Sequence, residues 1–243
     1  MRLAIVSDIH ANLQALEAVL DDVSSVGCEG IWCLGDVVGY GADPEACVDL
    51  VRKRAAVCLA GNHDLGVLGE LSIEGFSDPA RLAAEWTAGV ISSSAATFLR
   101  GLSPGAVEQA VAMFHGSPRD PVWEYVLSEE QARLALDASP RRVTLVGHSH
   151  VALAYGEDAG SSVAGGPRGA GDRLAVGSGL WLLNPGSVGQ PRDGDPRAAW
   201  LELDLDSWHA TFRRVAYDIH RAAGAIREAG LPEALAERLH HGQ

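Results

Sequence analysis

Long apolar runs are missing from this 243-residue sequence, and none approaches the roughly 20 residues that a membrane-spanning helix needs. The N-terminal residues MRLAIVSDIH lead directly into a short apolar stretch that has no signal-peptide cleavage site. We therefore expect a cytoplasmic protein that does not associate with a membrane.

Cysteine is also scarce, and the spacing CxxC does not occur. The four cysteines are Cys28, Cys33, Cys47 and Cys58. Without paired CxxC motifs a zinc knuckle is excluded. Two of the cysteines lie in the strand-like runs IWCLGD and AVCLAGNHD, where thiols pack as small apolar groups. The sequence therefore predicts buried, reduced thiols.

Positive charge is in short supply as well. The formal net charge is −13, and Lys53 is the one lysine among the basic residues. Because affinity for a nucleic-acid backbone comes from clustered Lys and Arg side chains, this composition argues against a long nucleic acid as partner. A small anionic substrate is still compatible with it, provided that bound metal cations supply positive charge locally.

The composition is that of a folded soluble domain, with 47% hydrophobic and 21% charged residues. Apolar runs predict strands at 2–7, 30–35 and 55–61, and amphipathic patterns predict helices at 15–23 and 44–54. This βαβαβ order indicates an α/β fold with parallel strands. One longer helix is predicted over 79–100. The second half consists of short alternating stretches typical of an antiparallel sheet, before one or two helices after Asp218.

Residues 156–172 stand apart because they are rich in glycine and nearly free of large apolar side chains. We predict a flexible loop between two strands here. A cover over the active site is the alternative role for this segment.

Polar motifs follow the predicted strands. The motifs are DIH (Asp8, His10), GDVVGYG (Asp36), GNHD (Asn62, His63, Asp64), FHGSP (His115), GHSH (His148, His150) and NPGSVGQPRD (Asn184, Arg192). Ligands of open α/β sheets bind beyond the carboxyl ends of the strands, so these residues can converge in space. Any one motif is typical of ordinary turns, since Asp and Gly are common there. Their joint occurrence after successive strands is specific.

This series resembles the calcineurin-like metallophosphoesterases, most closely the small bacterial and archaeal branch labelled phosphodiesterase or diadenosine-tetraphosphatase-like. The resemblance covers roughly residues 1–230. It implies a single α/β domain over 1–243, built from two packed mixed β-sheets flanked by helices in a four-layer sandwich.

The resemblance also implies a binuclear metal centre. One cation would be held by Asp8, His10, Asp36 and His150, and the other by Asp36, Asn62, His115 and His148. Carboxylate and imidazole ligands suit Mn, Fe, Zn, Ni or Co, and a shared carboxylate sets two cations about 3.5–4 Å apart. The implied reaction is attack on phosphorus by a hydroxide that bridges the two cations.

Three further residues receive roles from the resemblance. His63 is the implied general acid for the leaving oxygen, and Asp64 is expected to orient its imidazole. Arg192 is a candidate contact for the substrate phosphate. Asn184 and Ser187 are expected to shape the loop beneath the metals.

Several alternatives are weighed against this interpretation. An amidohydrolase would carry its HxH pair on the first strand, a metallo-β-lactamase-like hydrolase would have Asp where Ala152 stands, and a serine hydrolase would need GxSxG. A non-catalytic, metal-binding interaction scaffold is the alternative from a different class, and the presence of His63 disfavours it.

The substrate is less constrained by the motifs than the chemistry. Gly39 and Tyr40 stand where protein phosphatases of the superfamily carry a phosphate-binding arginine, which disfavours a phosphoprotein. We expect a small phosphate-ester or nucleotide substrate, with a phosphodiester ahead of a diadenosine polyphosphate or a phosphomonoester. The oligomeric state is left open.

Overall fold

The central strand of the molecule buries both of its faces. The computed structural model describes residues 1–157 and 162–243. In β1 (Arg2–Val6), Leu3 and Ile5 pack into the core between two sheets, whereas Ala4 and Val6 pack against helices on the other side. Successive side chains of a strand point to opposite faces, so a continuous apolar run is what a strand covered on both sides requires.

The first sheet has six strands in the order β3-β2-β1-β11-β12-β9. Besides β1, its members are β2 (Gly30–Cys33), β3 (Val57–Cys58), β9 (Arg173–Ala175), β11 (Ala198–Asp204) and β12 (His209–Val215). The predicted parallel order of β1, β2 and β3 is confirmed, with α1 (Leu13–Val26) and α2 (Pro44–Arg54) as the crossover helices. The strand β11 then pairs antiparallel with β1 and makes the sheet mixed.

The second sheet has the order β4-β5-β6-β10-β7-β8. Its strands are β4 (Gly105–Glu108), β5 (Val111–Phe114), β6 (Val143–Leu145), β7 (Ala152–Glu157), β8 (Ala164–Pro167) and β10 (Leu180–Pro185). The expectation of an antiparallel sheet is wrong for its centre, where β5, β6 and β10 run parallel. The parallel pair β5 and β6 is connected by α6 (Glu129–Ala138), a helix that the sequence patterns missed, and a helical crossover returns the chain in the same direction.

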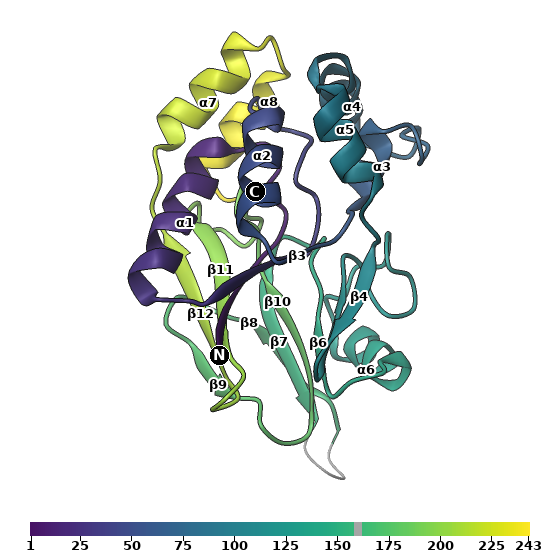
Figure 1. Ribbon diagram of the computed structural model, residues 1–243, viewed down its shortest axis with the longest axis vertical. Helices are drawn as coiled ribbons and strands as arrows, with labels where there is room; N and C mark the ends of the chain where they lie inside the picture. The colour runs from purple at the N-terminus through teal and green to yellow at the C-terminus, as the bar shows by residue number, and fades with distance from the viewer. Residues whose placement is uncertain (158–161) are drawn as a thin grey trace.

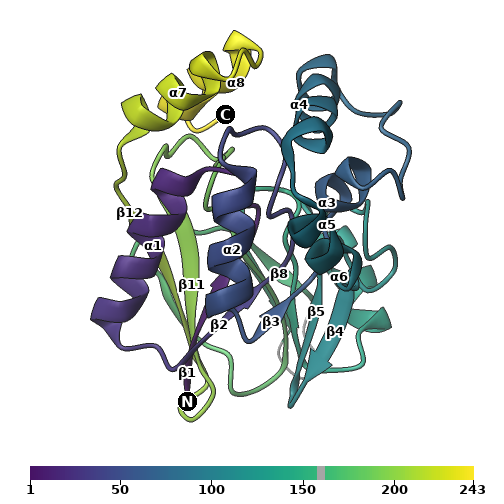
Figure 2. The same cartoon turned by 45° about the horizontal axis from the view of Figure 1, so that its top comes forward.

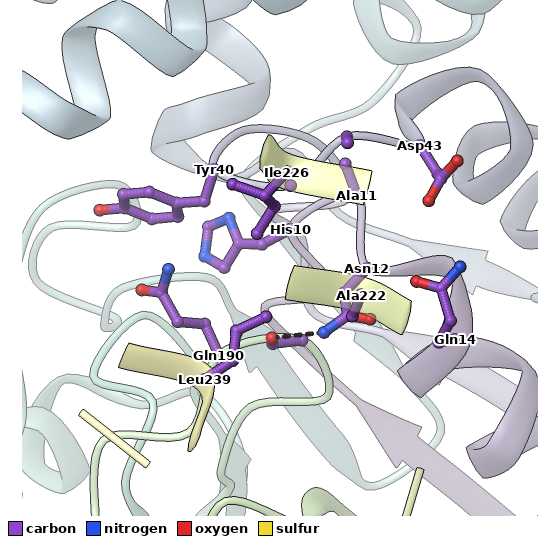
Figure 3. A pocket seen from close by; sticks show the side chains of 13 residues that line it. His10, Ala11, Asn12, Gln14, Tyr40, Asp43, Gln190, Ala222, Ile226 and Leu239 are labelled. Atoms are coloured by element: carbon purple, nitrogen blue, oxygen red, sulfur yellow. Dashed lines mark hydrogen bonds between the residues drawn. The ribbon is translucent and has the colours of Figure 1, made fainter. Parts of the chain in front are cut away.

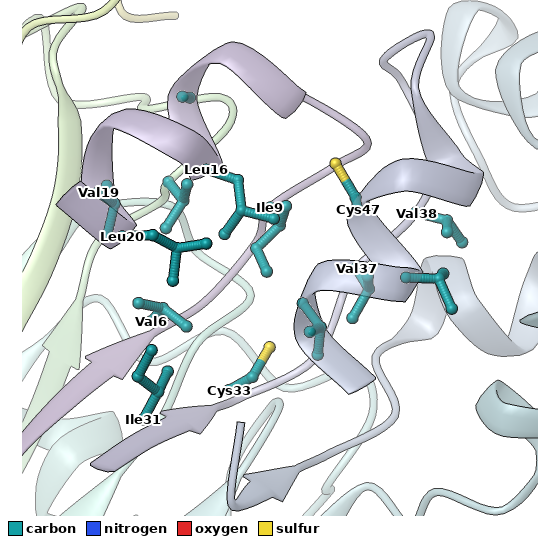
Figure 4. Close-up of a cluster of buried hydrophobic side chains, with 14 of the residues drawn as sticks. Val6, Ile9, Leu16, Val19, Leu20, Ile31, Cys33, Val37, Val38 and Cys47 are labelled. Atoms are coloured by element: carbon teal, nitrogen blue, oxygen red, sulfur yellow. The ribbon is translucent and has the colours of Figure 1, made fainter. Parts of the chain in front are cut away.

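Helices cover the outer faces of both sheets (Figures 1 and 2). On the first sheet, Leu16 and Leu20 of α1 meet Val6 and Ile31 of the strands, as Figure 4 shows. On the second sheet, α6 forms a separate apolar cluster with β7 and β10. The predicted sandwich of two mixed sheets flanked by helices in a single domain is therefore confirmed.

The helices at the end of the chain close one end of the sandwich. The elements α7 (Ile219–Glu228), α8 (Glu233–Glu237) and the short 3₁₀ helix η1 (Arg238–His240) form an apolar cluster with α4 (Asp78–Val90). Tyr40 belongs to the same cluster. None of the helices in the described parts of the chain has the length and apolarity to span a bilayer.

The single helix predicted over 79–100 is in fact two helices. The element α4 ends at Val90 and α5 (Ser93–Arg100) begins after Ser92. The backbone of Ser92 is extended, and its hydroxyl accepts a hydrogen bond from Ala95 N (3.1 Å). The carboxylate of Glu45 accepts from both the backbone N and the hydroxyl of Ser92. Serine as N-cap competes with helix continuation, and this local signal was missed.

The glycine-rich segment is a strand over part of its length. Residues 164–167 form β8, which pairs antiparallel with β7, whereas a loop was predicted over 156–172. A Cβ atom on Gly165 would lie 2.1 Å from Ala154 O, so glycine is required there for close strand pairing. Residues 158–161 lie outside the described residues.

The cysteine side chains are free thiols. Cys33 and Cys47 are buried, as expected, whereas Cys28 and Cys58 are partly exposed. The prediction of buried thiols is therefore correct for two of the four positions.

Candidate metal centre

The predicted ligand residues lie on the turns that follow the strands. Asp8 and His10 follow β1, Asp36 follows β2, Asn62 begins α3 (Asn62–Val67), His115 follows β5, and His148 and His150 follow β6. All seven are buried. Five of them adopt a left-handed backbone, with φ of 54° at Asp8, 50° at His10, 54° at Asp36, 65° at His148 and 59° at His150. This conformation costs free energy for residues other than glycine, and such strain concentrates at functional sites.

The first group of ligand atoms comes from Asp8, His10, Asp36 and His150, whose donor atoms all lie within 4.8 Å of one another. His10 Nε2 is 3.6 Å from Asp36 Oδ2 and 3.9 Å from Asp8 Oδ1. His150 Nε2 is 3.4 Å from Asp8 Oδ1. This arrangement surrounds a single point with two carboxylates and two imidazoles.

The second group comes from Asp36, His115 and His148. His115 Nε2 lies 3.5 Å from Asp36 Oδ2 and 3.0 Å from Asn62 Oδ1. The structure thus brings all seven predicted ligand residues together. Asp36 Oδ2 contributes to the distances of both groups, which puts this one oxygen between two possible cation positions.

Backbone carbonyls fix the orientation of three imidazoles. His10 Nδ1 lies 3.1 Å from Val38 O, His115 Nδ1 lies 2.9 Å from Leu34 O, and His150 Nδ1 lies 2.6 Å from Gln190 O. Since a carbonyl only accepts, Nδ1 of each ring donates and Nε2 carries a lone pair toward the centre. His10 Nε2 and His150 Nε2 are 3.0 Å apart, and two facing lone pairs at this distance repel each other unless a cation lies between them.

Other ligand atoms have no partner in the protein. Asp8 Oδ1, Asp36 Oδ2 and His148 Nε2 are buried without a hydrogen bond. Burial raises the pKa of Asp8 to about 7 and lowers that of His148 to about 2. Unpaired buried polar atoms are costly, and cations would satisfy all three. The set of carboxylate, imidazole and amide donors fits divalent transition metals.

Residues 1–206 match the calcineurin-like phosphoesterase superfamily domain. The chain belongs to this superfamily. An uncharacterized protein of Methanocaldococcus jannaschii is 37% identical over 248 residues, covering 99% of this chain and 98% of the relative. A metallophosphoesterase from Sphaerobacter thermophilus has a similar crystal structure, with a TM-score of 0.91, 43% identity and coverage of 100% of this chain and 99% of that one. A protein from Pyrococcus horikoshii, 19% identical, shares the fold with a TM-score of 0.79 over 100% of this chain and 98% of that one.

In this calcineurin-like phosphoesterase, the segment NPGSVGQ supports the metal centre from beneath. Ser187 Oγ donates to Asp8 O (2.7 Å), and Asn184 Nδ2 donates to Gly147 O (2.7 Å) and Ser149 Oγ (3.0 Å). These bonds connect the turn after β10 to the two turns that carry Asp8, His148 and His150. The segment therefore holds these turns against each other.

The expected pairing of Asp64 with His63 is not what the structure shows. Asp64 Oδ1 accepts from the backbone N atoms of Val37 (3.0 Å) and Val38 (3.1 Å), and Oδ2 accepts from Gly61 N (2.9 Å). Both carboxylate oxygens are thus used to join the turn after β2 to the turn after β3. Asp64 orients the backbone that carries Asp36 and Asn62, and the imidazole of His63 is positioned in another way.

Packing positions His63. Its ring centroid lies 4.4 Å from that of Tyr40 and 4.6 Å from that of Phe76. His63 Nδ1 has no hydrogen-bond partner and lies against Gly39, where a Cβ atom would be 2.6 Å away. Burial, followed by the charge of Arg192, lowers the pKa of His63 well below its ordinary value.

A cavity of about 250 Å³ opens beside the ligands. We call it the aromatic pocket, and its lining includes Tyr40, Asn62, His63, Phe76, Trp123, Tyr125, Arg192 and Arg238. A second cavity, behind His10, has a volume of about 10 Å³ and has room for about one water molecule. Figure 3 shows His10 there, between Tyr40 and Gln190. The aromatic pocket is the wider of these two cavities beside the candidate ligands.

Sequence patterns identified Tyr40, Asn62, His63 and Arg192 in this pocket, but not Phe76, Trp123, Tyr125 or Arg238. Arg192 donates to Tyr40 Oη (3.3 Å) and Gln190 Oε1 (2.9 Å). Gln190 stands inside the motif QPRD and could have been found there. Trp123 and Arg238 lie in segments without a recognisable motif, and only the fold brings them to the site.

Asp64→Asn tests the structural role of this carboxylate. An amide offers one oxygen where the carboxylate offers two, so at least one buried N–H loses its acceptor, at a cost of about 1–3 kcal/mol. We expect a lower free energy of unfolding in urea with chelator present, and weaker metal binding at both positions. The exposed Asp21→Asn is the control. Unchanged unfolding and metal content would show that Asp64 does not hold the two turns together.

Asp36→Asn tests the shared oxygen. Removing its charge should lower metal occupancy at both positions, whereas His148→Ala should affect only the second one. Elemental analysis after equilibrium dialysis measures the two variants against the wild type. Retention of one full metal equivalent in Asp36→Asn would contradict the shared position of Oδ2.

Proposed function

We propose that this protein is a binuclear metal-dependent phosphoesterase that hydrolyses small phosphodiesters. The observation that carries the proposal is the position of Asp36 Oδ2 between two groups of buried ligands. When bound there, two divalent cations would activate a water molecule and offset the charge of the phosphate. Asp8, His10, Asp36 and His150 would hold one of them, and Asp36, Asn62, His115 and His148 the other.

The groups around the ligands supply what hydrolysis needs besides the metals. The Nδ1 atom of His63 lies against Gly39, so Nε2 is the atom left to give a proton to the leaving oxygen. Burial and Arg192 favour the neutral imidazole, and a phosphate bound between His63 and Arg192 would favour the protonated form. Arg192 also places a guanidinium where it can bind a phosphate oxygen.

Reconstitution of metal-depleted protein with Mn, Fe, Zn, Ni or Co tests the activity directly. We expect close to two metals per chain, loss of activity with chelator, and faster hydrolysis of bis-p-nitrophenyl phosphate than of p-nitrophenyl phosphate. A diadenosine polyphosphate provides the third substrate class. Absence of phosphodiester hydrolysis with every one of these metals would overturn the proposal.

His63→Asn separates proton transfer from metal binding. The variant should keep its metals and lose about 10²–10⁴ in rate on esters with alkoxide leaving groups. The loss should be much smaller with p-nitrophenolate, because this leaving group departs with little protonation. Measuring kcat over leaving groups of graded basicity decides the matter. An equal loss across the series, with metals bound, would mean that His63 positions the phosphate instead of protonating the leaving oxygen.

A further inference from the structure

Two arginines of the aromatic pocket share one neutral acceptor. Arg192 Nη2 donates to Gln190 Oε1 at 2.9 Å, and Arg238 Nη1 donates to the same oxygen at 3.1 Å. Their guanidinium carbons lie 5.7 and 5.9 Å from the ring centroid of Tyr40. In the parts of the chain that the structure describes, no carboxylate lies within ion-pair distance of either guanidinium. Both charges are therefore left without an anionic partner.

Two neighbouring guanidinium groups without an anionic partner raise the free energy of the protein unless an anion binds between them. Arg192 and Arg238 are both partly buried, and their like charges repel. Burial and the charge of Arg192 together lower the pKa of Arg238. Planar guanidinium groups match the oxygens of a phosphate, so the pair has the geometry and charge of a phosphate site.

Arg238 is the outer member of this pair. The backbone N of Arg192 donates to the ligand residue His150 at its carbonyl oxygen (3.1 Å). Arg238 lies in η1, beyond the residues 1–206 that match the superfamily domain. Arg238 therefore stands on an element that carries no candidate ligand, which makes it the candidate contact for a second phosphate.

Aromatic side chains form another wall of the same pocket. Trp123 and Tyr125 are 39% and 42% exposed, which is unusual for large aromatic side chains beside a buried site. The ring centroid of Trp123 lies 5.9 Å from that of Phe76. Asp120 Oδ1 accepts from Trp123 N (3.0 Å) and so fixes the turn. Exposed rings held in place offer a stacking surface for a planar base.

We propose that the substrate is a nucleotide with at least one phosphate beyond the scissile ester. Arg238 binds this non-scissile phosphate while Arg192 binds the scissile one, and Trp123, whose ring lies against Phe76, stacks on the base. The proposal rests on the phosphoesterase function proposed above and names its substrate class.

Binding of two nucleotides that differ by one phosphate to the metal-loaded protein tests this inference. Titration calorimetry compares AMP with α,β-methylene-ADP, which differs by one phosphate. The wild type should bind the diphosphate about tenfold or more tightly than AMP, because charge-assisted hydrogen bonds to phosphate are strong. Arg238→Gln should abolish this preference. Arg221→Gln, an exposed arginine of α7, is the matched control and should keep it.

Trp123→Ala tests the base. It should weaken binding of both nucleotides by the same factor, about tenfold, and leave the preference for the diphosphate intact. Equal binding of the two nucleotides by the wild type, or a preference that survives in Arg238→Gln, would overturn the phosphate site. Unchanged nucleotide affinity in Trp123→Ala would overturn the stacking of a base. Because calorimetry measures binding, these results are independent of whether the protein hydrolyses phosphodiesters.

Discussion

The buried carboxylate of Asp36 is the group on which the rest of the site depends. One of its oxygens accepts from His63 N (2.8 Å), and the other has no partner in the protein and faces the histidines of both ligand groups. A carboxylate this deeply buried has a pKa well above its ordinary value, with burial as the first cause and the charge of Asp64 as the second. The fold thus holds a charge that is unfavourable for the protein by itself and favourable once cations share it.

The cost of building this centre is offset by the two sheets behind it. Left-handed backbone at five ligand residues and several unpaired polar atoms both oppose folding. Burial of the apolar layer between the sheets contributes hydrophobic free energy that offsets these costs, and Ile5, Leu145 and Leu201 in this layer are almost fully buried. Hydrogen bonds from the NPGSVGQ segment and from Asp64 then hold the turns in place at the edge of these sheets.

The convergence of the candidate ligands could be predicted because they follow strands, and strand ends in an α/β fold meet at one edge. What could not be predicted depends on contacts between distant segments. The break at Ser92 involves Glu45, which lies 47 residues away, and the parallel centre of the second sheet depends on the missed helix α6. The partner of Asp64 was misjudged for the same reason. Adjacency in sequence suggested His63, whereas the fold presents three backbone N–H groups from two turns.

Chemistry and selectivity are carried by different parts of the chain. The strand ends supply the buried candidate ligands, and in the proposed function these act on the phosphorus ester whatever groups it carries. Part of the lining of the aromatic pocket comes from the turn before α6, with Trp123, and from η1, with Arg238. This division also resolves the apparent conflict between a net charge of −13 and an anionic substrate. Since charges beyond about 10 Å are largely screened by salt, the nearby pair Arg192 and Arg238 would act on the proposed substrate more strongly than the distant acidic surface.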